Sequence, residues 1–483
     1  MSPASVDRSE APALATAERL AAEGRAADAL ALAWRALDAA PAGPARRLVA
    51  GLLKAHPSLA ASERRDDLAR LVADPELNPT PLAKAAWTLL LREGLLECGP
   101  AAVEADALAL RLLEETFVTL LDAELGLTAL RRELLLGGGC RDHPRLAQAL
   151  VRQAAHNGGA WWFEEDERAR LAETPGFAAA FLPPRRQSEG GASFDDAVTA
   201  KVADQYRAWP YPAWTRINRQ EPTTLTEAVA KVDPGGLPVP RDARVLVAGC
   251  GTGRDAAIFA RRYPHARITA IDLSETSLAE AEERCAGLGV EFRQLDLHRV
   301  AELGRRFDFI TCSGVLHHLP DPEAGWAALA EVLKPGGVLR VLVYSRIARL
   351  RVRAARTYVA DLVDRPVTDD LLRAVRRRLI EKAPLLLSAS RDFYTLGGIH
   401  DLLLHRHEDP FDVPRIRRAI DRLGFTLLAF VLPTPEDRAR YLGEHPEDPL
   451  LRSYEGWAAL EKKAPFMFAR MYEFWCRKQG RAG

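Results

Sequence analysis

The spacing of apolar residues divides the chain into a helical first part and an alternating second part. From about Leu14 to Leu182, apolar positions recur every three or four residues. Ala, Leu, Arg and Glu dominate there, and β-branched residues are scarce. This periodicity and composition predict a succession of amphipathic helices. The sequence therefore indicates an all-α region at the N-terminal side.

The segment Ala21–Pro41 shows the helical pattern most clearly. Gly24 breaks one helix, Ala27–Leu37 forms the next with small and large residues alternating on one face, and Pro41 follows its end. The spacing resembles one tetratricopeptide (TPR) repeat, a helix pair of about 34 residues. A second copy cannot be laid over the residues that follow. A degenerate TPR-like array and a plain helical bundle are therefore both open interpretations, and the first would offer a surface for a peptide or protein partner.

From Arg241 onward, short apolar runs alternate with segments of helix length. Because strands separated by crossover helices form a parallel sheet covered on both faces, this pattern predicts a Rossmann-like, doubly wound α/β fold. An irregular, largely helical insert (Ile347–Glu408) follows, and Pro414–Pro433 predicts one more helix and strand. The expected strands before the insert are Ala243–Gly249, Ala266–Asp272, Val290–Asp296, Phe307–Ser313 and Gly337–Ser345.

Two irregular segments separate these parts. The polar, Gly/Ser-rich stretch Pro183–Ser193 is typical of a domain linker. The segment Asp204–Arg216 carries two prolines among the aromatic residues Tyr206, Tyr211 and Trp214, which disfavours a regular helix. It is interpreted either as a lid over a ligand or as a hydrophobic tether. The expected organisation is a helical TPR-like region (1–185), a linker and lid (186–240), a ligand-binding α/β core (241–346) and a C-terminal insert that completes the sheet (347–483).

Composition and charge narrow the class of protein. The 66 Lys and Arg residues balance 66 Asp and Glu residues, and hydrophobic residues make up 48% of the chain. The hydrophobic fraction is typical of globular proteins, and with no net charge the chain has no overall positive potential to attract nucleic acid or an anionic membrane. The six cysteines show no CxxC spacing, the N-terminus lacks the basic and apolar regions of a signal peptide, and no apolar run could span a bilayer. We expect a cytoplasmic protein with free thiols, no metal centre and no membrane partner.

The chemistry is concentrated at Gly249-Cys250-Gly251-Thr252-Gly253, where an apolar strand runs directly into a helix. Glycines permit the tight turn and let the backbone approach a ligand without an intervening Cβ. Nineteen positions after Gly253, Asp272 ends the second strand, where a carboxylate suits the two hydroxyls of a ribose. The GxGxG spacing departs from the GxGxxG of nicotinamide-binding enzymes and so disfavours that class of oxidoreductase.

Further motifs follow in order along the α/β region. GVLHHL (Gly314–Leu319) follows the fourth strand, and LKPGG (Leu333–Gly337) precedes the fifth. Together with the AGCGTG loop and the acid at Asp272, these motifs resemble the class I S-adenosylmethionine-dependent methyltransferases over Ala243–Ser345. QYRAWPYPAW (Gln205–Trp214) extends the resemblance to the subfamily with a TPR-like N-terminal region. The Asn/Asp-Pro-Pro-Tyr signature of amino-directed relatives is absent after the fourth strand.

The resemblance implies S-adenosylmethionine as the methyl donor and assigns roles around it. The loop glycines shape the turn, Asp272 holds the ribose hydroxyls, and Asp296 with Leu297 flanks the adenine. The residues expected around the donor are Gly249, Cys250, Gly251, Gly253, Asp272, Leu273, Asp296, Leu297, Ser313, Tyr206 and Tyr211.

The acceptor side is less constrained by the motifs. Of the two histidines after the fourth strand, His317 is the expected general base, and the alternative is that the pair only shapes the loop. In the insert, Tyr394, His405 and His407 are expected to line the acceptor pocket; a surface helix is the alternative interpretation, and a metal site is disfavoured. The catalytic candidates are therefore His317, Tyr394, His405 and His407.

The identity of the acceptor stays open at the sequence level. The helical region favours a peptide or protein acceptor, or a protein partner, and a small-molecule acceptor is the competing hypothesis. A hypothesis from another class is a non-catalytic interaction protein with a vestigial methyltransferase fold. The intact glycine loop and the presence of Asp272 argue against it, since a decayed site need keep neither.

Overall fold

The computed structural model describes residues 10–41, 43–173, 181, 196–363, 365–432, 434–465 and 471–480. The chain forms two compact units. Unit 1 comprises residues 1–184, 213–219 and 365–399, and unit 2 comprises residues 185–212, 220–364 and 400–483. The linker expected at Pro183–Ser193 lies outside the described residues. Part of the expected C-terminal insert, residues 365–399, therefore belongs to the helical unit.

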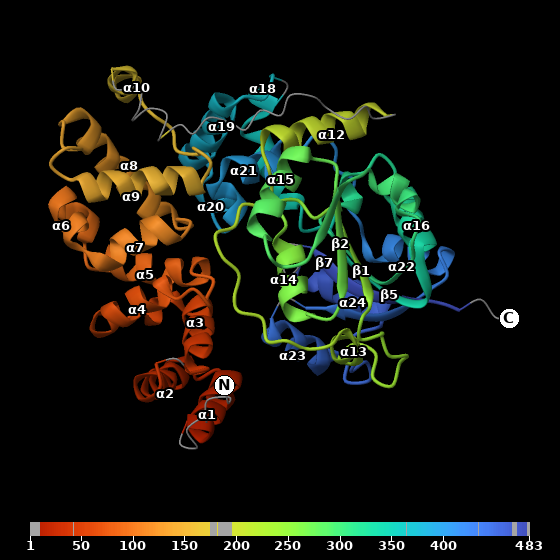
Figure 1. Cartoon of the computed structure of the whole chain (residues 1–483). Coiled ribbons are helices and arrows are strands. Elements are labelled where there is room, and N and C mark those ends of the chain that lie inside the picture. Colours follow the sequence, from red (N-terminus) through yellow and green to blue (C-terminus); the bar gives the residue numbers. More distant parts are fainter. Residues whose placement is uncertain are drawn as a thin grey trace. The chain divides into compact units, whose positions relative to one another are not determined.

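Unit 1 is helical, as the apolar spacing predicts (Figure 1). Gly24, with φ +79°, turns the chain between the first two helices, which pack on each other, and the second packs on the third. Trp87 and the leucines of successive helices form a continuous buried core. The α-helices are α1 (Glu10–Ala22), α2 (Ala26–Ala39), α3 (Ala45–Ala55), α4 (Arg65–Ala73), α5 (Thr80–Arg92), α6 (Pro100–Ala105), α7 (Ala107–Glu115), α8 (Leu121–Leu136), α9 (Pro144–His156), α10 (Glu165–Ala172), α19 (Asp369–Lys382) and α20 (Pro384–Leu387). The 3-10 turns are η1 (Pro57–Leu59), η2 (Ser62–Arg64), η3 (Leu95–Cys98) and η6 (Arg391–Tyr394).

A buried ion pair fastens α19 to α8 within unit 1. The two terminal nitrogens of the Arg376 guanidinium each donate a 2.5 Å hydrogen bond to the Glu124 carboxylate, although 252 residues separate the partners. Both side chains are essentially excluded from solvent. The Arg376 Nε donates to the carbonyl of Phe393, so the guanidinium also holds η6. This pairing explains why residues after 365 cluster with the N-terminal helices.

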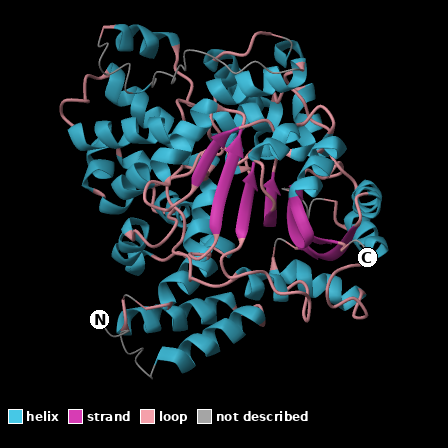
Figure 2. Ribbon diagram, turned by 45° about the vertical axis from the view of Figure 1, so that its right-hand side comes forward, coloured by secondary structure: helices cyan, strands magenta, loops and turns pink. Residues whose placement is uncertain are grey.

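Unit 2 contains a seven-stranded sheet of order β3-β2-β1-β4-β5-β7-β6 (Figure 2). The first five strands pair in parallel, and β7 runs antiparallel between β5 and β6. The doubly wound prediction is confirmed, and the C-terminal aromatic segment supplies the strand that the sequence pattern did not identify. The strands are β1 (Arg244–Ala248), β2 (Arg267–Asp272), β3 (Glu291–Gln294), β4 (Phe307–Ser313), β5 (Leu333–Val343), β6 (Phe425–Val431) and β7 (Tyr472–Lys478).

Helices cover both faces of this sheet (Figure 2). Along β1, Leu246 joins the core on one face, whereas Val245 and Val247 join the core on the other, as the two-residue period of a strand requires. The remaining helices are α12 (Ala197–Ala208), α13 (Leu225–Ala230), α14 (Arg254–Arg262), α15 (Glu275–Arg284), η4 (Leu297–Leu303), η5 (Leu316–His318), α16 (Pro322–Val332), α17 (Leu350–Thr357), α18 (Ala360–Val363), α21 (Leu396–Leu403), α22 (Val413–Arg422), α23 (Pro435–Glu444) and α24 (Tyr454–Lys463). None of the described helices is long and apolar enough to cross a lipid bilayer.

Candidate functional site

A cavity of about 1340 Å³, including the part open to solvent, lies at the carboxyl ends of β1, β2, β4 and β5. Its lining residues all belong to unit 2. In a parallel α/β sheet, this edge is where loops after adjacent strands diverge and leave room for a ligand. The residues expected around the donor that line the cavity are Gly249, Cys250, Gly251, Asp272, Leu273, Leu297, Ser313, Tyr206 and Tyr211.

The glycine loop is held against the end of β2. The backbone N–H groups of Gly249 and Cys250 both donate to the carbonyl of Ile271, at 2.8 and 2.9 Å. The Gly251 N–H donates a 2.7 Å hydrogen bond to Asp272 Oδ2, and the Ser274 N–H donates to Asp272 Oδ1 at 2.9 Å. Asp272 therefore faces the glycine bend, as the sequence predicts. Desolvation raises the pKa of its carboxyl, which the N–H groups of Ser274 and Gly251 only partly offset.

The chemistry of this half of the cavity fits an adenosyl donor. Each Asp272 oxygen accepts one backbone hydrogen bond and keeps a further lone pair, so the carboxylate can accept from a pair of ribose hydroxyls. The Ser277 hydroxyl, which also lines the cavity, is buried and has no hydrogen-bond partner among the described residues. Leu297 and Ile271 supply apolar surface for a base. A polar ligand with a flat apolar end would satisfy these groups.

Two residues expected at the donor site lie elsewhere. A Cβ on Gly253 would come within 2.8 Å of the Ala281 Cβ, so this glycine allows α14 and α15 to pack closely rather than admitting a ligand. The Asp296 carboxylate accepts from the His298 N–H at 2.8 Å and lies 3.2 Å from His298 Nδ1. Asp296 therefore caps η4, and neither residue is among those lining the cavity.

The segment Asp204–Arg216 is helical as far as Ala208, the end of α12, where an irregular segment was expected, and the residues after it lie against the glycine loop. The Thr252 N–H donates to the carbonyl of Tyr211 at 3.2 Å, and the Thr252 hydroxyl donates to the carbonyl of Pro212 at 2.6 Å. A Cβ on Gly251 would lie only 2.2 Å from the Tyr211 carbonyl oxygen, so the close approach requires glycine. The third aromatic residue of the expected lid, Trp214, belongs to unit 1.

At the other end of the cavity, a buried carboxylate is held by two tyrosines. Tyr206 donates to Asp401 Oδ1 at 2.7 Å, and Tyr344, directly after β5, donates to Asp401 Oδ2 at 3.1 Å. Only 2% of the Asp401 surface is exposed. Burial raises the pKa of the Asp401 carboxyl to about 6, although the two hydroxyl donors and the Arg349 charge pull it down.

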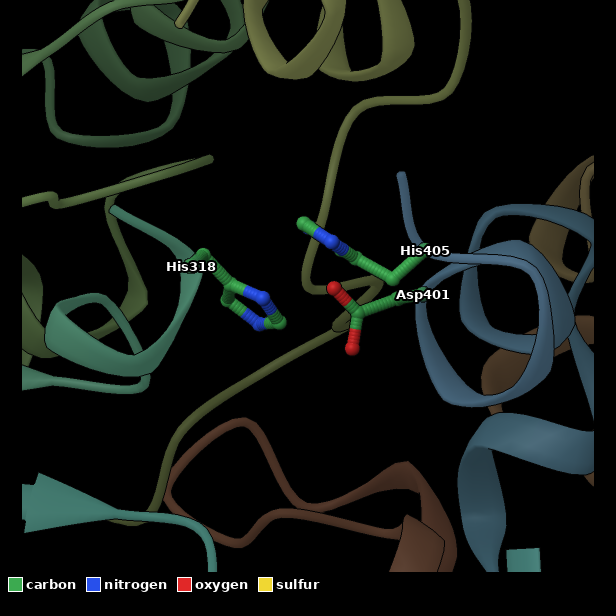
Figure 3. A group of neighbouring side chains, drawn as sticks. All are labelled: His318, Asp401 and His405. Carbon is green, nitrogen blue, oxygen red and sulfur yellow. The ribbon is translucent and has the colours of Figure 1, made fainter. Parts of the chain in front are cut away.

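His318 and His405 complete this cluster with Asp401 (Figure 3). One nitrogen or oxygen atom of each residue lies within 4.8 Å of the others, a spacing that a metal ion would accept. However, the two imidazole rings stack, with centroids 3.6 Å apart and planes 21° from parallel, so their in-plane lone pairs do not converge on one point. His405 Nδ1 already accepts from the His407 N–H, and its Nε2 lies 3.1 Å from the Tyr206 hydroxyl. Asp401, Tyr206 and His405 therefore form a hydrogen-bonded network, and the His318 ring stacks on His405, an arrangement unlike a metal ligand set.

The catalytic candidates from the sequence are distributed unevenly. His317 is fully buried, accepts from the Tyr344 N–H at its Nδ1, and does not line the cavity; its neighbour His318 does. His405 lies in the cluster, whereas His407 contributes backbone groups to it. Tyr394 belongs to unit 1, where its hydroxyl donates to the Ser388 carbonyl at 2.8 Å, and it does not line the cavity.

The sequence reasoning did not assign Asp401 or Tyr344 to the site. The signal for Asp401 was present, because it lies between His400 and His405 in a segment dense with histidines and acids. Nothing in the pattern, however, indicated that this segment returns to the edge of the sheet. The isolated bridge between Ser345 and Phe411 and the hydrogen bond from the Asp409 N–H to the His317 carbonyl are tertiary contacts that bring it there.

Comparison with known proteins agrees with this geometry. A family described as "Methyltransferase domain" matches residues 245–337. An uncharacterised protein of Synechococcus sp. is 35% identical over 265 residues, which cover 50% of this chain and 61% of that protein. A ubiquinone biosynthesis O-methyltransferase of Pseudomonas fluorescens is 38% identical over 97 residues, or 20% of this chain and 41% of that protein. A trans-aconitate 2-methyltransferase of Variovorax paradoxus is 30% identical over 195 residues, or 40% of this chain and 67% of that protein.

The matched regions therefore span about three fifths of the Synechococcus protein and about two fifths of the ubiquinone-pathway enzyme. Among solved structures, PKMT2 from Rickettsia typhi in complex with AdoHcy resembles this chain with a TM-score of 0.37 at 18% identity, covering 53% of this chain and 52% of that one.

Proposed function

We propose that this chain, which belongs to the class I S-adenosylmethionine-dependent methyltransferases, binds its donor at the glycine loop and methylates an acceptor held in the same cavity. The observation that carries the proposal is the hydrogen bond from the Gly251 N–H to Asp272 at one end of a cavity whose other end holds Asp401 and His318. Donor-type chemistry and acid–base chemistry therefore share one enclosed space.

In this proposal, some cavity residues bind the donor and others exclude water from it. Asp272 accepts the ribose hydroxyls, and Leu297 with Ile271 covers the base. When bound, S-adenosylmethionine supplies an activated methyl group on a sulfonium, so the protein needs mainly to orient the two reactants and exclude water. Tyr206 from α12 and Tyr211 from the segment that lies against the glycine loop both line the cavity and are suited to that exclusion.

A small-molecule acceptor is the form of this proposal that the cavity supports best. The relatives named for ubiquinone biosynthesis and for trans-aconitate carry the names of small molecules. The acceptor end of the cavity is lined by buried side chains, which suits a compact ligand better than an extended chain.

A peptide or protein acceptor is the second candidate, and the helical unit favours it. The pair α1 and α2, joined by the turn at Gly24, has the lengths and spacing of a TPR-like helix hairpin. Under this alternative, unit 1 holds a protein that carries or delivers the acceptor. All six cysteines are unpaired, which supports a cytoplasmic setting for either candidate.

Isothermal titration calorimetry of the full chain with S-adenosylmethionine and S-adenosylhomocysteine tests the proposal. We expect saturable binding of both compounds at one site. No heat of binding at high micromolar ligand would favour the vestigial scaffold instead. A cell extract is then divided by a small-pore filter, and each fraction is incubated with the protein and methyl-labelled donor. Label incorporated in the filtrate indicates a small-molecule acceptor, and label in the retained fraction indicates a protein acceptor.

A further inference from the structure

His318 presents an unused lone pair to the cavity. Its Nδ1 lies 2.9 Å from the carbonyl oxygen of His407, an atom that can only accept, so Nδ1 carries the proton. Among the described residues, the side-chain hydrogen bond of His318 is the one at Nδ1, so Nε2 of the neutral imidazole is left as an acceptor. Since His318 lines the cavity and is 5% exposed, this lone pair is available to a ligand in the cavity. A fixed tautomer with an open acceptor is the form that a general base requires.

The surroundings of His318 keep it in that form. Burial lowers the pKa of His318 to about 4, so the imidazole is neutral across the physiological range. The groups that face it are the rings of His317, Tyr344 and His405, the His407 carbonyl, and the charges of Arg349 and Glu408. The two charges are paired with each other through the Arg349 guanidinium, whose Nε donates to Glu408 at 2.6 Å.

Asp401 supplies a negative charge next to this base. Its carboxylate lies within the 4.8 Å cluster with His318 and His405, and the Tyr206 and Tyr344 hydroxyls fix both of its oxygens. A positive charge that forms on His318 is therefore created beside a buried, oriented anion. Such preorganised charge is stabilising because it needs no rearrangement at the moment of proton transfer.

The same charge selects the acceptor. Among the described residues that line the cavity, Arg254 is the one Lys or Arg side chain, and it lies by the glycine loop, 3.8 Å from Asp255. The acceptor end presents an anionic Asp401, a neutral His318 and a tyrosine hydroxyl. A carboxylate acceptor would meet repulsion there and would need no base. A neutral hydroxyl on a flat ring would find an acceptor for its proton and aromatic neighbours to pack on.

On the basis of the proposed methyltransferase function, we propose that His318 is the catalytic base and that the acceptor atom is a phenolic or enolic hydroxyl oxygen. As the O–CH3 bond forms and the bond from sulfur to that methyl group breaks, the O–H bond breaks and its proton moves to His318 Nε2. One positive charge thus leaves the sulfur and one appears on the imidazole beside Asp401. Asp401 is a positioning residue, since it acts through His318.

Chemical labelling tests the base without any acceptor. Diethyl pyrocarbonate reacts with neutral imidazole nitrogens, and tandem mass spectrometry distinguishes His317 from His318 in the tryptic peptide. We expect His318 to be labelled in preference to His317, at equal rates at pH 6.0 and 7.5, because it is neutral at both. An imidazole of ordinary pKa, near 6.5, would slow about fourfold at the lower pH. An unlabelled His318, or a fourfold slowing, would overturn the assignment of the base.

Turnover with two probes tests the acceptor class. Catechol offers phenolic hydroxyls, and trans-aconitate offers carboxylates that are already ionised. The variant His318→Asn keeps a donor near the Nδ1 position for the His407 carbonyl but removes the base; the exposed His265→Gln is the matched control. We expect methylation of catechol over trans-aconitate, a loss of about 100-fold or more in His318→Asn, and wild-type rates in His265→Gln.

Donor titration of the same samples tests donor binding separately from the role of His318. S-adenosylmethionine should bind His318→Asn as it binds the wild type, because His318 lies at the acceptor end. Donor binding without transfer to catechol, preferential transfer to trans-aconitate, or full activity in His318→Asn would overturn this inference alone. Failure of the wild type to bind the donor would overturn the proposed function.

Discussion

The hydroxyl of Tyr206 donates a 2.7 Å hydrogen bond to the carboxylate of Asp401, a residue 195 positions further along the chain. Tyr206 lies in α12, before the first strand of the sheet, and Asp401 lies in α21, after the fifth. The bond therefore joins, at the cavity, a helix that precedes the α/β core in the sequence and a helix that follows its fifth strand. It also fixes one oxygen of the single acidic side chain that we identify at the acceptor end of the described cavity wall.

The buried Asp401 carboxylate should cost stability at neutral pH. Its pKa of about 6 in the folded protein exceeds the ordinary value of an aspartate, so the folded state holds the proton more tightly than the unfolded chain. Stability from this group is present below about pH 4 and is lost as pH rises to about 6, an effect of about 3 kcal/mol. We expect Asp401→Asn to melt at a higher temperature than the wild type at pH 7.5.

The comparison by differential scanning fluorimetry should be made at pH 7.5 and pH 4.5. The gain in the variant should shrink at the lower pH, where the wild-type carboxyl is protonated. A variant that melts lower than the wild type at pH 7.5 would show that the two tyrosine hydrogen bonds outweigh the cost of burying the charge.

Turnover should depend on the same carboxyl. Because the ionised Asp401 stabilises a positive His318, we expect kcat/KM to fall on the acid side with an apparent pKa near 6, the value in the folded protein. Asp401→Asn should lower kcat by about 10-fold or more and abolish this acid limb, while leaving donor affinity unchanged. A purely structural role would instead lower activity equally at every pH, which the pH profile would reveal.

The donor carboxylate has a separate expected effect. Asp272→Ala removes a charge-assisted hydrogen bond to the ribose, so we expect S-adenosylhomocysteine to bind about 1–3 kcal/mol more weakly by calorimetry. Asp242→Asn, at an exposed acid just before β1 that pairs with the exposed Arg267, serves as the matched control. Equal affinity in Asp272→Ala and Asp242→Asn would remove the carboxylate from the donor site.

Two glycines with positive φ permit a test of the contact between the aromatic segment and the loop. Gly251 (φ +51°) and Gly24 (φ +79°) both resist alanine because of backbone strain of about 1–2 kcal/mol. Only at Gly251 would the new Cβ also meet another atom, the Tyr211 carbonyl oxygen. We expect Gly251→Ala to displace Tyr211 and weaken donor binding at least 10-fold, and Gly24→Ala to leave donor affinity unchanged. Similar donor affinities in the two variants would mean that the contact does not shape the site.

The buried pair in unit 1 should be sensitive to the loss of one partner. Glu124→Gln leaves the Arg376 guanidinium buried without its anion, which costs about 3–5 kcal/mol and should lower the melting temperature sharply. The double variant Glu124→Leu with Arg376→Met should recover much of that loss, because it removes both buried charges. If the double variant melts as low as Glu124→Gln, packing rather than charge governs the position.

The sequence by itself determined the parts of the protein that depend on local pattern. The short apolar runs located β1 to β4 to within two residues at each end, and the glycine spacing predicted the tight turn after β1 that Asp272 faces. Each of these features lies within a short stretch of sequence or on two neighbouring strands, so the identity and spacing of a few residues are enough to predict it. The helical character of the N-terminal residues followed from period and composition in the same way.

The tertiary structure alone decided which acids and histidines face the cavity. Asp296 follows β3 as expected, yet its carboxylate caps η4 instead of facing the cavity. Of the two neighbouring histidines, His318 lines the cavity and His317 does not. Asp401 and Tyr344 meet because a long insert folds back onto the carboxyl edge of the sheet. The capping by Asp296 is a contact over two residues, whereas the positions of Asp401 and His318 depend on hydrogen bonds to residues 57 and 89 positions away. No local spacing encodes them, because either orientation is compatible with the same strand and turn.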